Sequence, residues 1–276
     1  MTEPAAVDQR CYRHPDREAY ISCQRCERLI CPECMRDAAV GFQCPECVAE
    51  GRASVRAPRT ITGGAISMQA GAVSMVLLGI NVVVYVLQRA TEGNINSVFQ
   101  LGAMQGFAVA DGDYWRLLSA AFLHASILHI AFNMYALYLF GPYVERALGT
   151  MRFVVAYLTM AVASSVFVYW LTEPQIVTIG ASGAVFGLFG LALVLLIRTG
   201  QDVRGLLVLL AINAFISLQG NISWQGHLGG FITGTLLGVA LAYAPRERRS
   251  AVQFTAFAIT WLAIVVAVVA RTAQLG

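Results

Sequence analysis

Residues 180–197 read GASGAVFGLFGLALVLLI, an 18-residue stretch without a charged side chain. It lies within a longer uncharged gap between Glu173 and Arg198. A helix of about 20 apolar residues crosses the roughly 30 Å hydrocarbon core of a bilayer, and a charge near its centre is costly. The stretch therefore predicts a membrane-spanning helix that begins near Ser182.

Other uncharged stretches of similar length predict further spanning helices. The gap between 204 and 246 holds 41 residues, which is too long for one helix, and its polar, glycine-containing part at 219–226 divides it in two. Seven spans are therefore expected in all. The other six lie near 71–88, near 126–144, between 152 and 173, on either side of 219–226, and between 249 and 271.

The composition of the chain also favours a membrane protein. Of its 276 residues, 57% are hydrophobic and 13% are charged, and the mean hydropathy is +0.63. Soluble domains usually carry about 25% charged residues, which argues against an ordinary water-soluble enzyme. The charges are uneven, because 18 of the 35 ionised side chains lie in the first 59 positions. We therefore predict a polar module at 1–50, a linker at 51–68 and a membrane-embedded body after them.

The arginines predict how this body lies in the membrane. Cytoplasmic loops of membrane proteins carry an excess of positive charge. With a cytoplasmic N-terminus, 16 arginines fall on the inner side and three, Arg89, Arg116 and Arg271, fall on the outer side. Residues 1–50 contain no apolar signal-peptide segment, which agrees with this orientation. We expect a multi-pass plasma-membrane protein with its N-terminus in the cytoplasm and, after seven spans, its C-terminus outside.

The polar module contains all seven cysteines and one of the histidines, arranged as four pairs with two residues between the members of each pair. A CxxC turn places two sulfur atoms on one ion, and eight ligands suit two tetrahedral structural Zn²⁺ sites. Disulfides are disfavoured because seven is odd and the cytoplasm is reducing, which leaves unligated thiols as the other alternative. The candidate ligands are Cys11, His14, Cys23, Cys26, Cys31, Cys34, Cys44 and Cys47.

This spacing resembles B-box-type zinc fingers, with a CxxC pair where members of that family commonly end in histidines. The resemblance implies that the pairs interleave, whereas the spacing alone leaves the pairing open. No ligand position looks open for catalysis, so we expect a docking or regulatory module with a cytoplasmic protein partner. The implied groups are Cys11, His14, Cys31 and Cys34 for one ion, and Cys23, Cys26, Cys44 and Cys47 for the other.

Few polar side chains lie inside the predicted spans, and four of them share one depth. His129 and Asn133 fall on the second span, Ser182 opens the fourth and His227 opens the sixth. These spans all start on the outer side in the charge-derived topology, so the four side chains form one layer near the outer face. Polar residues inside a membrane are functional candidates, and a serine beside a histidine is typical of nucleophilic catalysis.

The layer lacks the carboxylate of a catalytic triad. Glu145, the acid inside the predicted spans, lies 16 residues from His129, or about 24 Å along a helix, so a Ser–His dyad is implied. His129 and Asn133 share a helix face and can donate hydrogen bonds to an oxyanion, as can the free amides at the start of the serine's helix. Aspartyl and HExxH metalloprotease chemistry are excluded, because the spans contain no aspartate and no histidine precedes a glutamate.

Five motifs of the body, in this order, resemble those of the rhomboid intramembrane serine proteases. The resemblance covers about residues 71–244 and implies that Ser182 is the nucleophile and His227 the general base, with no cofactor for catalysis. His129, Asn133 and the Ser182 amide would hold the oxyanion. The motifs are Trp115-Arg116, His124-x4-His129-x3-Asn133, Gly141-x3-Glu145-x3-Gly149, Gly180-x-Ser182-Gly183 and Gly226-His227-x-Gly229-Gly230.

The resemblance also implies supporting roles for neighbouring residues. Phe186, four residues after the serine, would pack on His227, and Gly180 would support the site just before the serine. His124 either lines the site or makes a hydrogen bond at the membrane interface. Small residues allow membrane helices to approach closely, and the sixth span is expected to approach the fourth through Gly230, Gly234 and Gly238, with Gly183 and Gly187 opposite them.

The sequence thus predicts an all-α polytopic membrane protein with a small zinc-binding domain at 1–50. A rhomboid-like core of six transmembrane helices spans 69–245, and an additional C-terminal helix spans 246–276. The expected activity is cleavage of transmembrane proteins in the lipid bilayer, at or near its outer side, and no nucleic-acid partner is expected. The alternative is a catalytically silent rhomboid-like scaffold that binds transmembrane helices. The presence of both Ser182 and His227 argues against that alternative.

Overall fold

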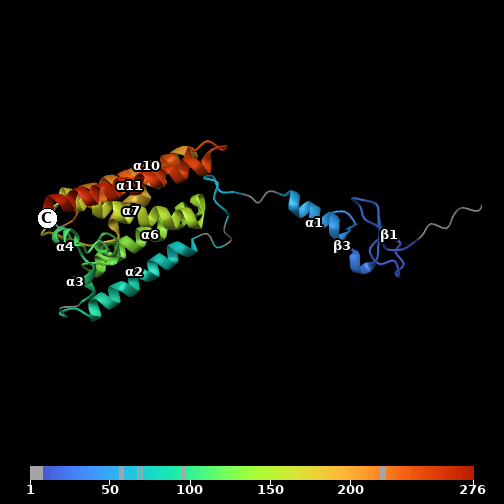
Figure 1. Ribbon diagram of the computed structural model, residues 1–276, viewed down its shortest axis with the longest axis horizontal. Helices are drawn as coiled ribbons and strands as arrows, with labels where there is room; N and C mark the ends of the chain where they lie inside the picture. The colour runs from blue at the N-terminus through green and yellow to red at the C-terminus, as the bar shows by residue number, and fades with distance from the viewer. Residues whose placement is uncertain (1–8, 56–58, 67–68, 70, 95–96, 218–221) are drawn as a thin grey trace, which may run out of the picture. The chain divides into compact units, whose positions relative to one another are not determined.

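The computed structural model describes residues 9–55, 59–66, 69, 71–94, 97–217 and 222–276, which are coloured in Figure 1. The chain divides into two compact units, Met1–Pro58 and Arg59–Gly276. The first unit contains the cysteines and the second contains the long apolar helices. The division falls inside the segment that the sequence predicts as a linker.

The first unit consists of two short β-hairpins and a helix around a core of cysteines. Six of its seven cysteines are buried, and so are Ala19 and Ile30. So few apolar side chains cannot stabilise about 50 residues without an additional staple. The elements are β1 (Ile21–Ser22) paired with β2 (Leu29–Ile30), η1 (Pro32–Cys34), β3 (Arg36–Asp37) paired with β4 (Phe42–Gln43), and α1 (Pro45–Ser54).

In the described part of the second unit, seven helices of 14 residues or more occupy the positions of the seven predicted spans. The predicted break at 219–226 falls partly outside the described residues, and its last three residues, 224–226, are the first of the sixth of these helices. The helices are α2 (Ala72–Ala90), α6 (Ile127–Leu148), α7 (Thr150–Leu171), α8 (Ser182–Arg198), α9 (Arg204–Ser217), α10 (Trp224–Ala242) and α11 (Arg249–Leu275).

Within the described residues, four helices, α2, α6, α7 and α11, are long and apolar enough to cross a membrane. Helices α8 and α9 are also apolar but have only 17 and 14 residues. Several apolar helices of this length identify a multi-pass membrane protein, and the mostly helical architecture confirms the predicted fold class. Ser182 is the first residue of α8, so the length of this helix bears on the depth of Ser182 in the membrane.

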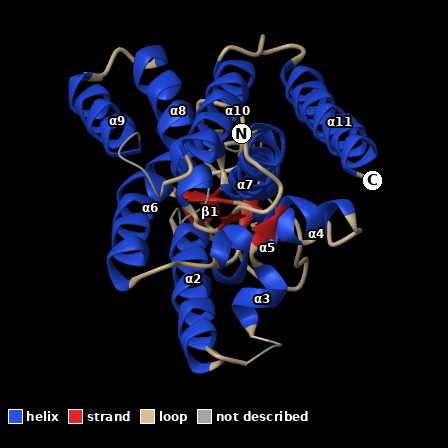
Figure 2. Ribbon diagram, turned by 90° about the vertical axis from the view of Figure 1, so that its left-hand side faces the viewer, coloured by secondary structure: helices blue, strands red, loops and turns tan. Residues whose placement is uncertain are grey.

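Helix α7 lies in the middle of the bundle, whereas α9 and α11 lie on opposite sides of it (Figure 2). The apolar window of α7 is 67% buried within the protein, and that of α11 is 11% buried. Large side chains such as Tyr157, Phe153 and Met160 fill the centre of the bundle without any exposure. The peripheral helices therefore present most of their apolar surface to the lipid.

The segment between α2 and α6 folds into short elements. Arg116 holds it together, since its guanidinium donates to the carbonyl oxygens of Gln100 and Ala103, each at 2.8 Å, and pairs with Asp113 at 2.8 Å. The elements are α3 (Val98–Gly102), β5 (Met104–Gln105), α4 (Gly106–Ala110), α5 (Arg116–Ser119) and η2 (Ala120–Phe122), and β5 pairs with β6 (Val177–Thr178), which leads into α8.

The C-terminal part of α6 is tied to the start of α2 by a buried carboxylate. Glu145 accepts hydrogen bonds from the amides of Val73 and Ser74, at 3.3 and 2.9 Å, and from the Ser74 hydroxyl at 2.8 Å. Part of the predicted linker docks at the same end of α6, because buried Thr62 donates to the carbonyl oxygen of Leu148 at 3.3 Å. The ordered contacts of the second unit therefore begin before α2.

Helices α8 and α10 touch backbone to backbone, as the glycine spacing predicts. A Cβ atom on Gly230 would lie 1.8 Å from the carbonyl oxygen of Gly183, and one on Gly234 would lie 2.0 Å from that of Gly187. Real Cβ atoms essentially never come this close to another heavy atom. Only glycine allows this contact at these two positions of α10.

We predict that Gly230→Ala lowers the free energy of unfolding by about 3 kcal/mol, because the new methyl group must push two backbones apart. Gly79→Ala on α2 is the matched control, since nothing lies within 4 Å of its added Cβ. Thermal unfolding in detergent measures both variants. Equal stability of Gly230→Ala and Gly79→Ala would show that α8 and α10 are not in close contact.

Candidate active site

Ser182 occupies the first position of α8, where the chain leaves strand β6. Gly180 has a φ of +135°, a conformation that suits glycine, and its amide donates to the carbonyl oxygen of Ala120 at 2.9 Å. The first amides of a helix have no partner within the helix, and they create a positive end of the helix dipole. The serine hydroxyl therefore lies beside free N–H groups.

His227 lies in the first turn of α10 and is held from two sides. Its ring stacks on Phe186 of α8, with ring centroids 4.1 Å apart and an angle of 9° between the planes. Its Nδ1 lies 2.7 Å from the Oγ of Ser217, the last residue of α9. The residue is buried, and it lines a cavity.

His129 and Asn133 lie on the first turns of α6, whose N-cap, Ser126, accepts a hydrogen bond from the His129 amide at 3.1 Å. The Nε2 of His129 lies 2.8 Å from the position that a Cβ on Gly180 would take, and the Oγ of Ser182 lies 3.4 Å from the same point. His129 and Ser182 therefore border one small space, which a side chain at residue 180 would fill.

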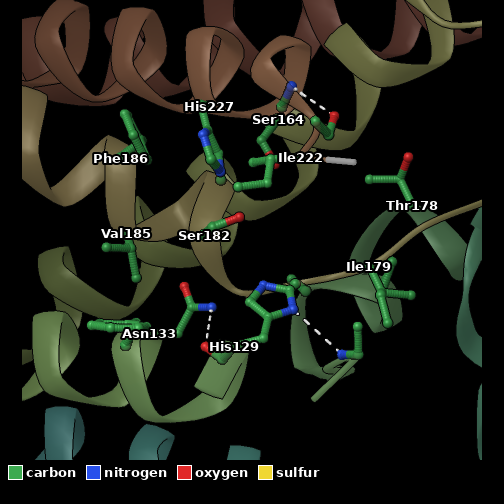
Figure 3. A pocket seen from close by; sticks show the side chains of 18 of the residues that line it. His129, Asn133, Ser164, Thr178, Ile179, Ser182, Val185, Phe186, Ile222 and His227 are labelled. Carbon is green, nitrogen blue, oxygen red and sulfur yellow. Dashed lines mark hydrogen bonds between the residues drawn. The ribbon is translucent and has the colours of Figure 1, made fainter. Parts of the chain in front are cut away.

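The four candidate side chains, Ser182, His227, His129 and Asn133, line one open cavity of about 1930 Å³, together with Phe186. In Figure 3, Ser182 lies between His227 on one side and His129 and Asn133 on the other. The hydrogen bonds of the described residues do not include one between Ser182 and His227. Catalytic hydrogen bonds are often long before substrate binds and shorten in the complex.

His124 lies behind the cavity and does not line it. It is fully buried, and neither ring nitrogen has a hydrogen-bond partner among the described residues. Its ring packs edge-on against His129, with centroids 5.1 Å apart, and against Tyr85 at 6.5 Å. The backbone of His124 exchanges two hydrogen bonds with the buried Gln88 side chain of α2, at 2.9 and 3.0 Å, and its ring packs between α2 and His129, so a site-supporting role for His124 stays a prediction.

Two serines near the cavity were not identified from the sequence. Ser164 of α7 lines the cavity, and its Oγ lies 2.1 Å from where a Cβ on Gly183 would be. Ser217 contacts His227 as described above. A polar residue inside an apolar span was the available signal for both, but nothing in the sequence relates the end of α9 to the start of α10 in space.

The eight candidate ligands of the first unit form two clusters in which the ligand atoms all lie within 4.8 Å of one another. His14 Nδ1 lies 3.4 Å from the sulfurs of both Cys31 and Cys34. Ligands of a tetrahedral zinc ion with 2.3 Å bonds are roughly 3.5–3.8 Å apart. The clusters have the composition implied by the B-box resemblance: Cys11, His14, Cys31 and Cys34 in one, and Cys23, Cys26, Cys44 and Cys47 in the other.

The thiols of one cluster show why a cation suits it. Burial acts to raise the pKa of Cys11, but hydrogen bonds from backbone amides outweigh this and lower it to about 6. In the same cluster, burial together with the neighbouring sulfurs of Cys11 and Cys31 raises the pKa of Cys34 to about 12. Metal ligation requires thiolates, and a bound cation removes the repulsion between them. All seven cysteines are free of disulfides, so this donor set fits a metal ion.

Comparison with known proteins identifies the second unit. Residues 111–244 match the family described as Rhomboid domain. Over 148 residues the chain is 38% identical to "Putative rhomboid protease YdcA" of Bacillus subtilis (strain 168), an alignment that covers 51% of this chain and 73% of that protein. The chain belongs to the rhomboid family. All four cavity-lining candidates lie within the matched residues, and the cysteine-rich unit lies outside them.

Other rhomboid relatives are longer or more distant. "Rhomboid protease GluP" of Bacillus subtilis (strain 168) is 33% identical over 172 residues, which is 59% of this chain but only 34% of that protein. "Rhomboid protease AarA" of Providencia stuartii is 26% identical over 218 residues, covering 67% of this chain and 78% of that protein. These named proteases support a protease function for this rhomboid chain.

Proposed function

We propose that this rhomboid protein is an intramembrane serine endopeptidase in which Ser182 is the nucleophile and His227 is the general base. One observation carries the proposal: the two residues lie in the first turns of helices whose backbones are in contact, and both line one cavity. The names of the bacterial relatives support it. Rhomboid proteases act on transmembrane substrates, which we propose for this chain as well.

The proposed reaction proceeds in two halves. Ser182 Oγ attacks the scissile carbonyl carbon while its proton passes to His227 Nε2, which gives a tetrahedral oxyanion. The C–N bond then breaks, the amine leaves with the proton from His227, and an acyl-serine remains. Water attacks this ester with His227 again accepting a proton, and the serine is restored. Glu145 does not join this dyad as a third member, because it accepts hydrogen bonds from Val73 and Ser74 at the other end of α6.

The oxyanion would be held by His129, Asn133 and the Ser182 amide. His129 Nδ1 accepts a hydrogen bond from the Ala125 amide at 3.3 Å, so the neutral ring carries its proton on Nε2, which faces the cavity. Asn133 donates one amide proton to the His129 carbonyl oxygen at 2.9 Å and retains a second. Both donors are thus fixed before substrate arrives, which is how enzymes stabilise developing negative charge.

The length of α8 supports cleavage within the membrane. Its 17 residues extend about 25 Å, less than the roughly 30 Å hydrocarbon core. If Arg198 lies at the cytoplasmic boundary, as the arginine distribution favours, Ser182 lies below the outer surface. The cavity is also lined by apolar side chains of α6 and α9, such as Phe132 and Ile212. We propose that it receives an unwound segment of a transmembrane substrate in the plasma membrane, near the outer side.

A serine-directed fluorophosphonate tests the proposed dyad. We predict that the full chain in detergent is labelled, that Ser182→Ala abolishes labelling and that His227→Ala slows it at least about 100-fold, because the base is lost. Gel fluorescence with intact mass spectrometry measures labelling. Ser54→Ala is the matched control, since this serine is exposed in the first unit and its hydroxyl donates to the Gly51 carbonyl oxygen of its own helix. A folded wild type that is not labelled would favour the silent scaffold.

The oxyanion roles proposed for His129 and Asn133 predict slower labelling when either side chain is removed. His129→Ala and Asn133→Ala should each lower the labelling rate constant about 100-fold without preventing folding, because each removes one preset donor. Asn81→Ala is the matched control: Asn81 donates to the carbonyl oxygen four residues earlier, as Asn133 does, but lies outside the cavity. Equal labelling rates for Asn133→Ala and Asn81→Ala would remove Asn133 from the proposed site.

We also propose that the first unit is a double-zinc module. Its two clusters combine thiolates and one imidazole, the ligands that structural Zn²⁺ prefers, and each supplies four donors with no open position. The metal would supply the folding energy that the small core cannot. The folded module would then be available to a cytoplasmic protein partner.

Metal analysis of the purified full chain tests this module. We predict about two zinc ions per chain, and about one in either Cys34→Ser or Cys47→Ser, because each variant disrupts one cluster. Tyr20→Phe, exposed and outside both clusters, should retain both ions. Inductively coupled plasma mass spectrometry gives the stoichiometry. A wild type without metal and with paired cysteines would overturn the zinc assignment.

A further inference from the structure

We propose that Ser217 is a positioning residue that fixes the tautomer and orientation of His227. The inference rests on the proposed role of His227 as the general base. Ser217 lies at the end of α9, is 4% exposed, and places its Oγ 2.7 Å from His227 Nδ1. No other side chain makes a hydrogen bond to His227 among the described residues.

The protons of this contact can be assigned from chemistry alone. The Ser217 hydroxyl also lies 2.7 Å from the carbonyl oxygen of Asn213, four residues earlier in α9. A carbonyl oxygen can only accept, so the single hydroxyl proton of Ser217 points to Asn213. The Oγ is then an acceptor toward His227, and Nδ1 must be the donor. The neutral imidazole therefore carries its proton on Nδ1 and has a lone pair on Nε2.

This tautomer is the one that a base opposite Ser182 needs. With the proton on Nε2, the ring would present a donor to the serine and could not accept its proton. Phe186 restricts the ring to one plane, but stacking does not distinguish the two edges of an imidazole. The Ser217 bond does, because a 180° ring flip would replace Nδ1 with a carbon atom. Phe186 thus fixes the plane of the imidazole ring, and Ser217 fixes which edge of the ring faces Ser182.

A hydroxyl also suits the position of this contact. In catalytic triads the third residue is a carboxylate that holds the histidine in its correct tautomer. A carboxylate buried among apolar membrane helices is costly. Ser217 supplies the orienting acceptor without a charge, and its own proton is satisfied within α9. The base thereby keeps one tautomer without a third, charged residue.

The isosteric pair Ser217→Thr and Ser217→Val tests the hydroxyl at nearly constant shape. Threonine can keep both bonds, because its Oγ1 also reaches the carbonyl oxygen of the preceding turn. We expect Ser217→Thr to be labelled by the fluorophosphonate near the wild-type rate and Ser217→Val about tenfold more slowly, as for the loss of one hydrogen bond. Thr260→Val is the matched control: it removes the same type of bond, from Thr260 to Ala256 on α11, and should label normally.

A spectroscopic measurement separates orientation from a general structural effect. Solid-state NMR of protein labelled with ¹⁵N-histidine distinguishes protonated from unprotonated ring nitrogens, and comparison with His227→Ala identifies the signals of residue 227. The wild type and Ser217→Thr should show a protonated Nδ1 and an unprotonated Nε2. Ser217→Val should show a mixture of tautomers. This readout does not depend on activity.

These experiments distinguish failure of the positioning role of Ser217 from failure of the proposed protease function. If wild type is not labelled, or Ser182→Ala still is, the proposed function fails whatever residue 217 does. If wild type is labelled and Ser217→Val matches it in rate, the positioning role is wrong and the dyad stands. Slower labelling of Ser217→Val with an unchanged tautomer, or a wild type protonated on Nε2, also overturns the inference.

Discussion

The close contact between the backbones of α8 and α10 is the constraint on which the rest of the membrane unit depends. Lipid is as apolar as leucine, so membrane helices associate by close packing and not by the hydrophobic effect. Glycines on both helices allow Gly230 to lie against the carbonyl of Gly183. Each helix carries a candidate catalytic residue in its first turn, so a contact that stabilises the bundle also sets the distance between Ser182 and His227. The interface between α8 and α10 therefore serves both the packing of the bundle and the proposed chemistry.

The apolar surroundings explain why the site is built from neutral groups. The buried carboxylate of Glu145 is used at the other end of α6, where it accepts three hydrogen bonds. Near the cavity, neutral groups contact the two histidines in place of charged partners. The Ala125 amide donates to His129 Nδ1, and the Ser217 hydroxyl oxygen lies against His227 Nδ1. In the proposed mechanism the two histidines are opposite tautomers: His129 faces the cavity with a donor and His227 with an acceptor. This difference matches the roles proposed for them.

Much of this architecture could be predicted from the sequence, because charge and glycine patterns act locally. Uncharged gaps located all seven long helices, and cysteine spacing indicated two four-ligand clusters. What could not be predicted depends on contacts between distant segments. The order in the α3–η2 segment depends on Arg116 reaching carbonyl groups 13 and 16 residues earlier. Likewise, the position of His124 behind His129 and the contact of Ser217 with His227 follow from helix packing, which no periodicity encodes.

Helix α9 contributes both to the wall of the cavity and to the contact that holds His227. Its buried residues are Leu206 and Ser217, and most of the rest of it is exposed or lines the cavity. Ile212, which lines the cavity, and Ser217, which contacts His227, lie on this one helix. The shape of the cavity wall and the orientation proposed for the base therefore depend on the position of the same helix.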